Sequence, residues 1–255
     1  MIRLVSFLTL ITLSLCPISR AWAQGPENTG PNFNVVRQWS GTLLMQTKRD
    51  KRYRGIEEWR MFVHSDGSRT MTLSKDFLAF NALQVMTAHV DENFRPIDVY
   101  ASYWAANGYR NSVRVALLGD ELRAASEGPR GHANKVIKVP HEISIVTHGE
   151  SMNGWYLWQG RQHTKDNVHS GIEFNLNPMP RAEGLSGGSL RPFTFQYIGK
   201  ETVTVPAGTF ETERYLLSNI ELWVTGTDRI LVKQAITDAD KEYILTRLES
   251  VPAKP

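Results

Sequence analysis

The chain has almost no cysteine. Cys16 is the single cysteine among 255 residues, and it lies in an N-terminal segment that we expect to be removed. The remaining chain can therefore form no disulfide, and thiolate zinc sites and a catalytic thiol are excluded from it. Stability has to come from an apolar core, which a chain of about 230 residues is long enough to build.

The chain also lacks an excess of charge of one sign. It carries 29 Lys and Arg against 26 Asp and Glu, which gives a formal net charge of +3. Loss of the N-terminal segment, with Arg3 and Arg20 and no acidic residue, lowers this charge to +1. A nearly neutral chain has no long-range positive field to attract nucleic acid. We therefore expect no nucleic-acid partner.

Motifs for cofactors and metals are missing as well. The sequence has no phosphate-binding loop, no G-x-S-x-G nucleophile turn, and no dinucleotide-binding glycine fingerprint after a strand. Its seven histidines include no H-E-x-x-H and no H-x-H spacing. We expect no cofactor and no metal site.

The N-terminus has the pattern of a secretory signal peptide. Arg3 precedes an apolar run over residues 4–15, and Ala21-Trp22-Ala23 forms a small-residue cleavage site. We predict a signal peptide over residues 1–23 and a periplasmic or secreted product. The apolar run is too short to span a bilayer, so we expect no transmembrane anchor in the mature form. Residues 24–34, rich in glycine and proline, are predicted to be a disordered leader before a single β domain at 35–250.

Short stretches that alternate apolar and polar residues dominate the rest of the chain. Residues 56–64, for example, place Trp59 and Met61 on one face and Glu58 and Arg60 on the other. Turn residues bound these stretches, and no long helical pattern separates them. The sequence therefore predicts a mainly β protein, a single antiparallel curved sheet or open β-barrel with a simple meander. One short helix is expected near residues 151–158, where it would cover the mouth of the barrel.

The clearest turn signal lies within residues 197–217. A β-branched run over residues 202–205 stops at Pro206-Ala207-Gly208, and a second run of β-compatible residues follows. Proline presets φ for the second position of a tight turn, and glycine is favoured at the fourth. The sequence predicts a β-hairpin here.

This hairpin carries a resemblance to a known family. The residues concerned are Glu201-Thr202-Val203, Val205-Pro206-Ala207-Gly208-Thr209-Phe210 and Glu213-Arg214-Tyr215. They resemble the C-terminal half of a family of bacterial periplasmic proteins known only as a domain of unknown function, and the match covers roughly residues 150–250. That family is similar to the open β-barrels that carry lipids across the periplasm. The resemblance implies a fold and a compartment, but no chemistry.

Several large apolar side chains share the inward positions of the predicted strands. They are Trp39, Met45, Trp59, Met61, Phe193, Phe195 and Tyr197. They could line a pocket for an apolar ligand or fill a core, and the alternation does not separate these two interpretations. Our first hypothesis is a periplasmic binding or carrier protein for an apolar or amphiphilic, lipid-like molecule. Residues 177–192, rich in glycine and proline, would form a flap that regulates access.

Two other classes of function stay open. One is a cofactor-independent acid–base enzyme that acts on a small lipophilic substrate, with His89, Asp91, His148 and Glu150 as its catalytic candidates. The other is an envelope assembly or interaction protein that uses its sheet edges. The basic cluster at residues 48–54 could touch anionic lipid headgroups, but a solvated hairpin tip is the preferred interpretation.

Overall fold

Strands make up most of the chain in the computed structural model, which describes residues 34–77, 81–106, 108–129, 131–161, 167–176 and 188–252. These residues belong to one unit, Phe33–Pro255. The predicted signal peptide and all but the last residue of the predicted leader lie outside the described residues. The described helices include none that is long and apolar enough to cross a membrane.

The elements follow one another with short connections. The strands are β1 (Val35–Gln46), β2 (Tyr53–His64), β3 (Arg69–Phe77), β4 (Ala82–Val90), β5 (Pro96–Ala105), β6 (Arg110–Leu118), β7 (Glu121–Gly128), β8 (Gly131–Lys138), β9 (Ile143–Val146), β10 (Val168–Asn175), β11 (Ser189–Val205), β12 (Gly208–Leu217), β13 (Ile220–Thr225), β14 (Ile230–Ile236) and β15 (Lys241–Pro252). Between β9 and β10 lie the 3₁₀-helix η2 (Glu150–Met152), the α-helix α1 (Asn153–Tyr156) and the 3₁₀-helix η3 (Trp158–Arg161).

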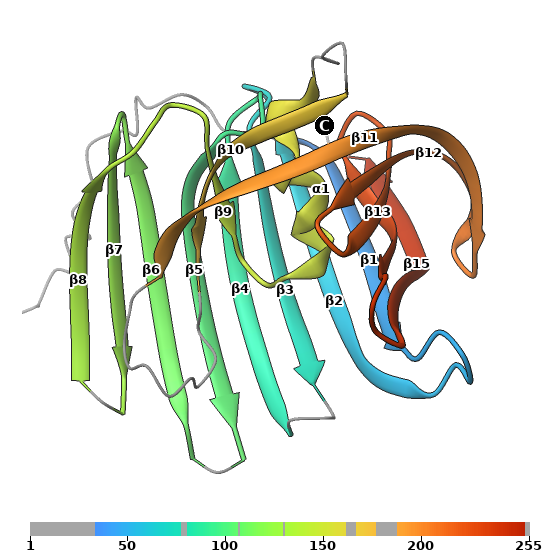
Figure 1. Cartoon of the computed structure of the whole chain (residues 1–255), viewed down its shortest axis with the longest axis horizontal. Helices are drawn as coiled ribbons and strands as arrows, with labels where there is room; N and C mark the ends of the chain where they lie inside the picture. The colour runs from blue at the N-terminus through green and yellow to red at the C-terminus, as the bar shows by residue number, and fades with distance from the viewer. Residues whose placement is uncertain are drawn as a thin grey trace, which may run out of the picture. The chain divides into compact units, whose positions relative to one another are not determined.

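All fifteen strands form one sheet. Their spatial order is β8-β7-β6-β5-β4-β3-β2-β1-β15-β14-β13-β12-β11-β10-β9. The first and last strands pair at a central seam, and from it one antiparallel meander runs out to β8 while the other runs back to β10 (Figure 1). Strand β9 pairs with β10 in parallel. Since β8 and β9 lie at the two ends of this order, the sheet does not close. The predicted curved antiparallel sheet is confirmed, although it contains two meanders instead of one.

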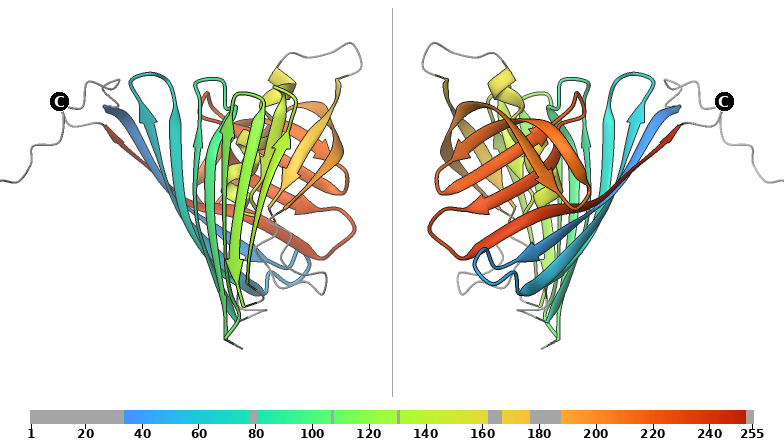
Figure 2. Two further views of the ribbon diagram at one scale, coloured as in Figure 1. Left: turned by 90° about the vertical axis from the view of Figure 1, so that its left-hand side faces the viewer. Right: turned by 90° about the vertical axis from the view of Figure 1, so that its right-hand side faces the viewer.

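The two meanders curl toward each other and form two walls around an interior (Figure 2). Alternation along the strands decides which side chains point inward. In β2, Glu57, Trp59 and Met61 are buried, whereas Glu58 and Arg60 face outward. The alternation predicted for this stretch is confirmed.

The predicted hairpin is present between β11 and β12. Val205 lies opposite Gly208 across the two-residue turn, and Gly208 has a φ of 140°, which favours glycine. Strand β11 begins earlier than expected, and Pro192 pairs with Ile172 of β10. Pro192 is tolerated because β12 pairs with β11 only from Phe195 onward, which leaves one side of β11 open at the proline. The predicted flap was therefore too long: residues 189–192 are strand, and 177–187 lie outside the described residues.

The predicted helix forms as η2, α1 and η3. It packs against both walls, since η2 contacts β2 and β14 and α1 contacts β13. The approach is close: a Cβ atom on Gly154 would lie 2.0 Å from the Arg229 carbonyl oxygen. We call residues 147–161 the plug.

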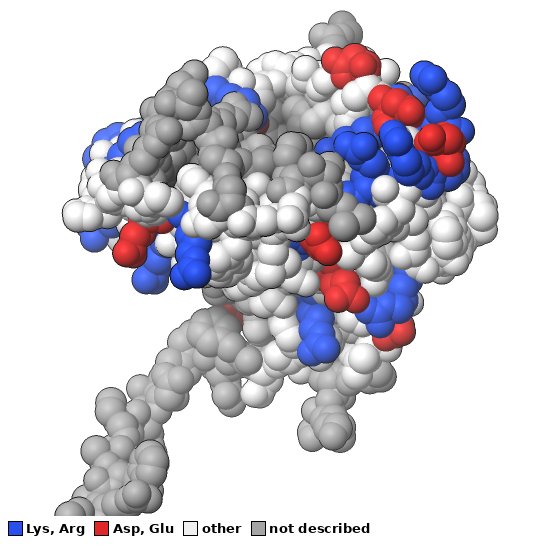
Figure 3. Space-filling view, turned by 90° about the horizontal axis from the view of Figure 1, so that it is seen from below, with Lys and Arg blue, Asp and Glu red and all other residues white. Residues whose placement is uncertain are grey.

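Positive and negative side chains are mixed on one face of the molecule. On the face in Figure 3, visible Lys and Arg side chains lie beside Asp and Glu side chains. The basic cluster at 48–54 covers the connection between β1 and β2 and the first two residues of β2, as expected for a hairpin tip. Two of its lysines contact the neighbouring strands: Lys51 forms an ion pair with Glu242 at 2.7 Å, and Lys48 donates a hydrogen bond to the Ile236 carbonyl oxygen at 2.7 Å.

Candidate functional site

A row of polar side chains crosses the inner face of the sheet. Its members are direct cross-strand neighbours on β2 to β6, and each is at most 7% exposed: Glu57, Lys75, Gln84, Tyr103 and Asn111. Two residues away along each strand, on the same face, lie apolar residues or a glycine. The polar row therefore separates two apolar layers of the interior.

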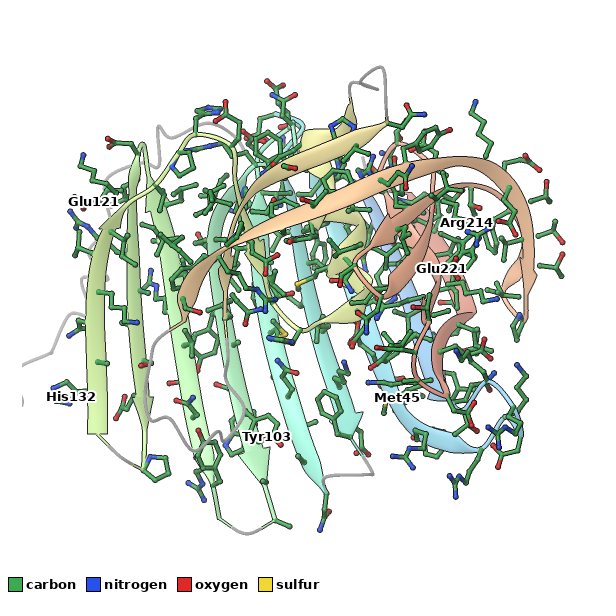
Figure 4. All side chains as sticks on the ribbon, viewed as in Figure 1. Met45, Tyr103, Glu121, His132, Arg214 and Glu221 are labelled. Atoms are coloured by element: carbon green, nitrogen blue, oxygen red, sulfur yellow. The ribbon has the colours of Figure 1, made fainter. Side chains whose placement is uncertain are left out.

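The smaller of these layers lies at one end of the strands. We call it the lower cluster, and it consists of Met45, Phe77, Ala82, Tyr243 and the ring of Tyr103, which also belongs to the polar row, with Ala105 and Tyr109 packed against it. Met45 and Tyr103 mark its place in the lower half of Figure 4. The larger layer contains the main core, including Trp59, Met61, Phe193 and Phe195.

The polar row supplies hydrogen-bond partners to the backbone of the plug. The Glu57 carboxylate accepts from the backbone N–H groups of Glu150 at 3.0 Å and Ser151 at 2.7 Å. Lys75 Nζ donates to the His148 carbonyl oxygen at 3.2 Å. An irregular segment inside a core has no sheet partners, and its polar groups are costly to leave unpaired. The buried charges of β2 and β3 are thus explained by the chain segment that enters beside them.

The electrostatics of the row centre on Lys75. Its ammonium contacts the Glu150 carboxylate and lies 3.8 Å from Glu57 Oε2. Burial lowers the pKa of Lys75 to about 7, although the nearby Glu57 charge acts in the opposite direction. The ammonium also lies 4.3 Å from the centre of the Phe77 ring and 5.1 Å from that of Tyr243. This lysine can exchange a proton near neutral pH while buried.

Three buried polar atoms around Lys75 have no hydrogen-bond partner within the described part of the chain. They are Gln84 Oε1, Ser151 Oγ and the Tyr243 hydroxyl oxygen. Burial also raises the pKa of Tyr243, which keeps its hydroxyl protonated and able to donate. Unsatisfied groups of this kind are places for water or for the polar atoms of a ligand.

A second set of contacts holds the plug to the loop between β13 and β14. Trp155 Nε1 donates to the Asp228 carbonyl oxygen at 3.1 Å, and Arg229 Nε donates to the Gly154 carbonyl oxygen at 2.7 Å. The Asp228 carboxylate in turn accepts from Trp39 Nε1 at 2.9 Å and Arg69 Nε at 3.1 Å. The plug is therefore fastened to both walls.

Plug side chains fill the space between the walls. The Tyr156 ring lies 4.9 Å from that of Phe193, and the Trp155 ring lies 6.1 Å from that of Phe94. The cavity left between the plug and strands β4 and β5 has a volume of about 20 Å³, which is room for roughly one water molecule. This cavity is too small for a lipid-like ligand.

The predicted ligand-binding residues are brought together only in part. Trp59, Met61, Phe193 and Phe195 lie in the main core and are at most 8% exposed, whereas Met45 belongs to the lower cluster. The remaining two, Trp39 and Tyr197, are half-buried and pack against the main core. Their role in binding stays a prediction.

The predicted catalytic residues fall into two separate places. His89 faces outward from β4, with Nδ1 3.9 Å from Asp98 Oδ2, and Asp91 accepts from the backbone N–H of Arg95 in a turn. His148 and Glu150 lie inside, in the plug, where Nε2 of His148 meets the Asn175 amide at 3.1 Å. The structure does not bring these two pairs together.

Lys75 was missed by the sequence reasoning, although a signal was present. It occupies an inward position of β3 between Leu73 and Phe77, where alternation predicts an apolar residue. A lysine there is rare without a partner. No group of three or more possible metal ligands occurs among the described residues.

Comparisons with known proteins find similarity to solved structures alone. No family model matches the chain, and no curated protein matches its sequence. Among solved structures, a β-barrel-like protein of the domain of unknown function DUF1849 from Brucella abortus has a TM-score of 0.45 and 10% identity. A putative exported protein with a YmcC-like fold from Bacteroides fragilis has a TM-score of 0.28 and 11% identity. Each match covers 85% of this chain and 98% of the other. Neither assigns an activity to this chain.

Proposed function

We propose that this protein is an exported binding or carrier protein for an apolar or amphiphilic molecule. When this molecule is bound, it takes the place of the plug between the two walls. One observation carries this proposal. The space between the walls is filled by an inserted segment, the plug, which contacts β2 on one side and β13 and β14 on the other. The space between the walls is therefore occupied by a part of the chain that belongs to neither meander.

The contacts of the plug favour such an exchange. Hydrogen bonds and ion pairs fasten it, and no residue of 147–161 belongs to a strand. Without the plug, the walls would expose the side chains that it now covers, including Leu73 and Met86 beside Gly149 and Phe193 beside Tyr156. The apolar part of a ligand would bury these side chains again.

The polar row would then contact the polar end of the ligand. Glu57 and Lys75 would lose their partners in the plug, and buried charges need replacements. A ligand with a polar group at one end supplies them, which favours an amphiphile over a pure hydrocarbon.

The test uses the mature chain purified gently from the compartment to which it is exported. Native mass spectrometry and organic extraction should reveal a bound hydrophobic molecule, and the extracted protein should bind palmitate. Tyr156→Ala should tighten palmitate binding, since the plug then covers less of the wall at Phe193. Phe195→Ala should weaken it by removing part of the wall.

Tyr53→Ala is the matched control, because Tyr53 is 45% exposed on β2. Its palmitate affinity should equal that of the wild type. A ligand-free mass together with no palmitate binding by the wild type or Tyr156→Ala would refute the carrier function.

Export rests on the N-terminal pattern and has its own test. Arg3, the apolar run and Ala21-Trp22-Ala23 predict cleavage before Gln24. N-terminal sequencing of the exported protein should begin at Gln24, and a chain that retains Met1 would contradict it.

A further inference from the structure

The outer face of the sheet carries a hollow over strands β5 and β6. It has a volume of about 450 Å³, and the hydroxyl side chains Ser102 and Ser112 line it. These two serines are direct cross-strand neighbours on β5 and β6. Both face outward, since Tyr103 and Asn111 beside them face inward.

Larger side chains border the two serines on both sides. Along the strands, Tyr100 lies opposite Arg114 on one side, and Trp104 lies opposite Arg110 on the other. All four share the outward face with the serines because they are two residues away from them. A short hydroxyl floor therefore lies between two aromatic–arginine pairs.

The aromatic rings are held at the surface. Tyr100 is 45% exposed and Trp104 38% exposed. Ser102 Oγ donates to the Tyr100 hydroxyl oxygen at 2.7 Å, which fixes the tyrosine over the floor. The two residues are four apart on one strand, so their Cα atoms are separated by about 13 Å. The space between Tyr100 and Trp104 is therefore long enough for a molecule made of a few linked rings.

Two arginines lie on this face: Arg110 lines the hollow, and Arg114 lies beside it on β6, two residues from Ser112. Neither Arg110 nor Arg114 forms an ion pair in the part of the chain that the structure describes. One acidic side chain, Glu127, lines the hollow, opposite Ser112. Two unpaired guanidinium groups beside one carboxylate attract an anion, and the planar guanidinium binds a carboxylate in bidentate fashion.

We propose that this hollow binds an acidic saccharide. A pyranose ring has an apolar C–H face that can stack on Trp104 or Tyr100, and hydroxyl groups that can bond to Ser112 and Glu127. The carboxylate of a uronic acid would meet the arginines. A neutral sugar would leave the arginines without a counter-charge, and an aliphatic anion would leave the aromatic rings without a partner. This site is independent of the interior and of the carrier function.

The experiment titrates the mature chain with tetragalacturonate by isothermal titration calorimetry, with neutral maltotetraose as the matched sugar. We expect saturable tetragalacturonate binding that weakens with added salt, and weaker binding of maltotetraose. Trp104→Ala and Arg110→Gln should each weaken tetragalacturonate binding about tenfold, which is the effect of losing one good contact. Arg60→Gln, an exposed outward arginine on β2, should leave it unchanged.

Folding of the variants is checked by thermal unfolding, and Trp104→Phe should keep most of the affinity since it retains a ring. Absence of saturable tetragalacturonate binding would overturn the proposal. Equal affinity for the two sugars, or an unchanged affinity in Trp104→Ala with Arg110→Gln, would overturn it as well.

Discussion

Lys75 should make the stability of the protein depend on pH near neutrality. Burial lowers the pKa of this ammonium from 10.5 to about 7 in the folded chain. In the unfolded chain the lysine returns to its ordinary value. Between pH 7 and about 10 the unfolded chain therefore binds more protons than the folded chain, and the free energy of unfolding must rise with pH in this window.

The expected size follows from the two pKa values. One proton of difference gives a slope of about 1.4 kcal/mol per pH unit. Because the folded lysine is only half deprotonated at pH 7, the free energy of unfolding should increase by about 2 kcal/mol between pH 7 and pH 9. This gain should be absent from a variant without the titrating group.

Urea unfolding at pH 7, 8 and 9, followed by tryptophan fluorescence, measures this gain. The reference is the double variant Lys75→Met with Glu150→Gln, which removes the ammonium and one of the carboxylates that it neutralises. The control is Lys138→Met. Lys138 is exposed, and its hydrogen bond to Asp120 raises its pKa, so its contribution is lost as pH rises instead of gained.

The wild type should gain stability relative to the double variant as pH rises, whereas the difference between wild type and Lys138→Met should not grow. Parallel curves for the wild type and the double variant from pH 7 to pH 9 would refute a lowered pKa for Lys75. If the free energy of unfolding of the wild type also rose with pH relative to that of Lys138→Met, the increase would be a property of lysines in general and not of Lys75.

Three further predictions concern stability, each measured by chemical denaturation. Gly154→Ala should cost about 1–3 kcal/mol, since its Cβ would overlap the Arg229 carbonyl oxygen; an unchanged midpoint would mean that the plug has room to shift. Phe195→Ala should cost about 3–5 kcal/mol because it empties a fully buried site, while the exposed Tyr53→Ala should stay within about 0.5 kcal/mol. Asp228→Asn should cost about 3 kcal/mol by leaving the buried Arg69 guanidinium without its carboxylate, and a loss below about 1 kcal/mol would contradict that account.

Local chemistry made much of the fold predictable. Pro206 and Gly208 specified the hairpin between β11 and β12, and alternation identified the inward face of β2 around Trp59. The existence of a short helix near Trp155 was also predictable from the spacing of its apolar residues. Each of these signals acts within about ten residues of sequence.

Features that depend on distant contacts could not be predicted. The pairing of β1 with β15 has no local signal, since it is decided by which edges remain after the hairpins form. Strand β8 has only a weak sequence signal because it lies at the edge of the sheet, where outward residues such as His132 and Val136 are exposed and the apolar alternation is weak. The plug contacts of Lys75 depend on a segment more than seventy residues away.

The seam between β1 and β15 has a consequence for the order of folding. During synthesis, β1 to β8 can pair in turn through short connections, but the second edge of β1 has no partner until the last strand has been made. That contact joins residues as far apart as Arg37 and Pro252, and such distant contacts form slowly. Until then the chain exposes a long unpaired edge that can join another chain. A chain truncated before Lys241 should therefore aggregate, whereas one that lacks only β8 should lose an outer strand and keep the seam.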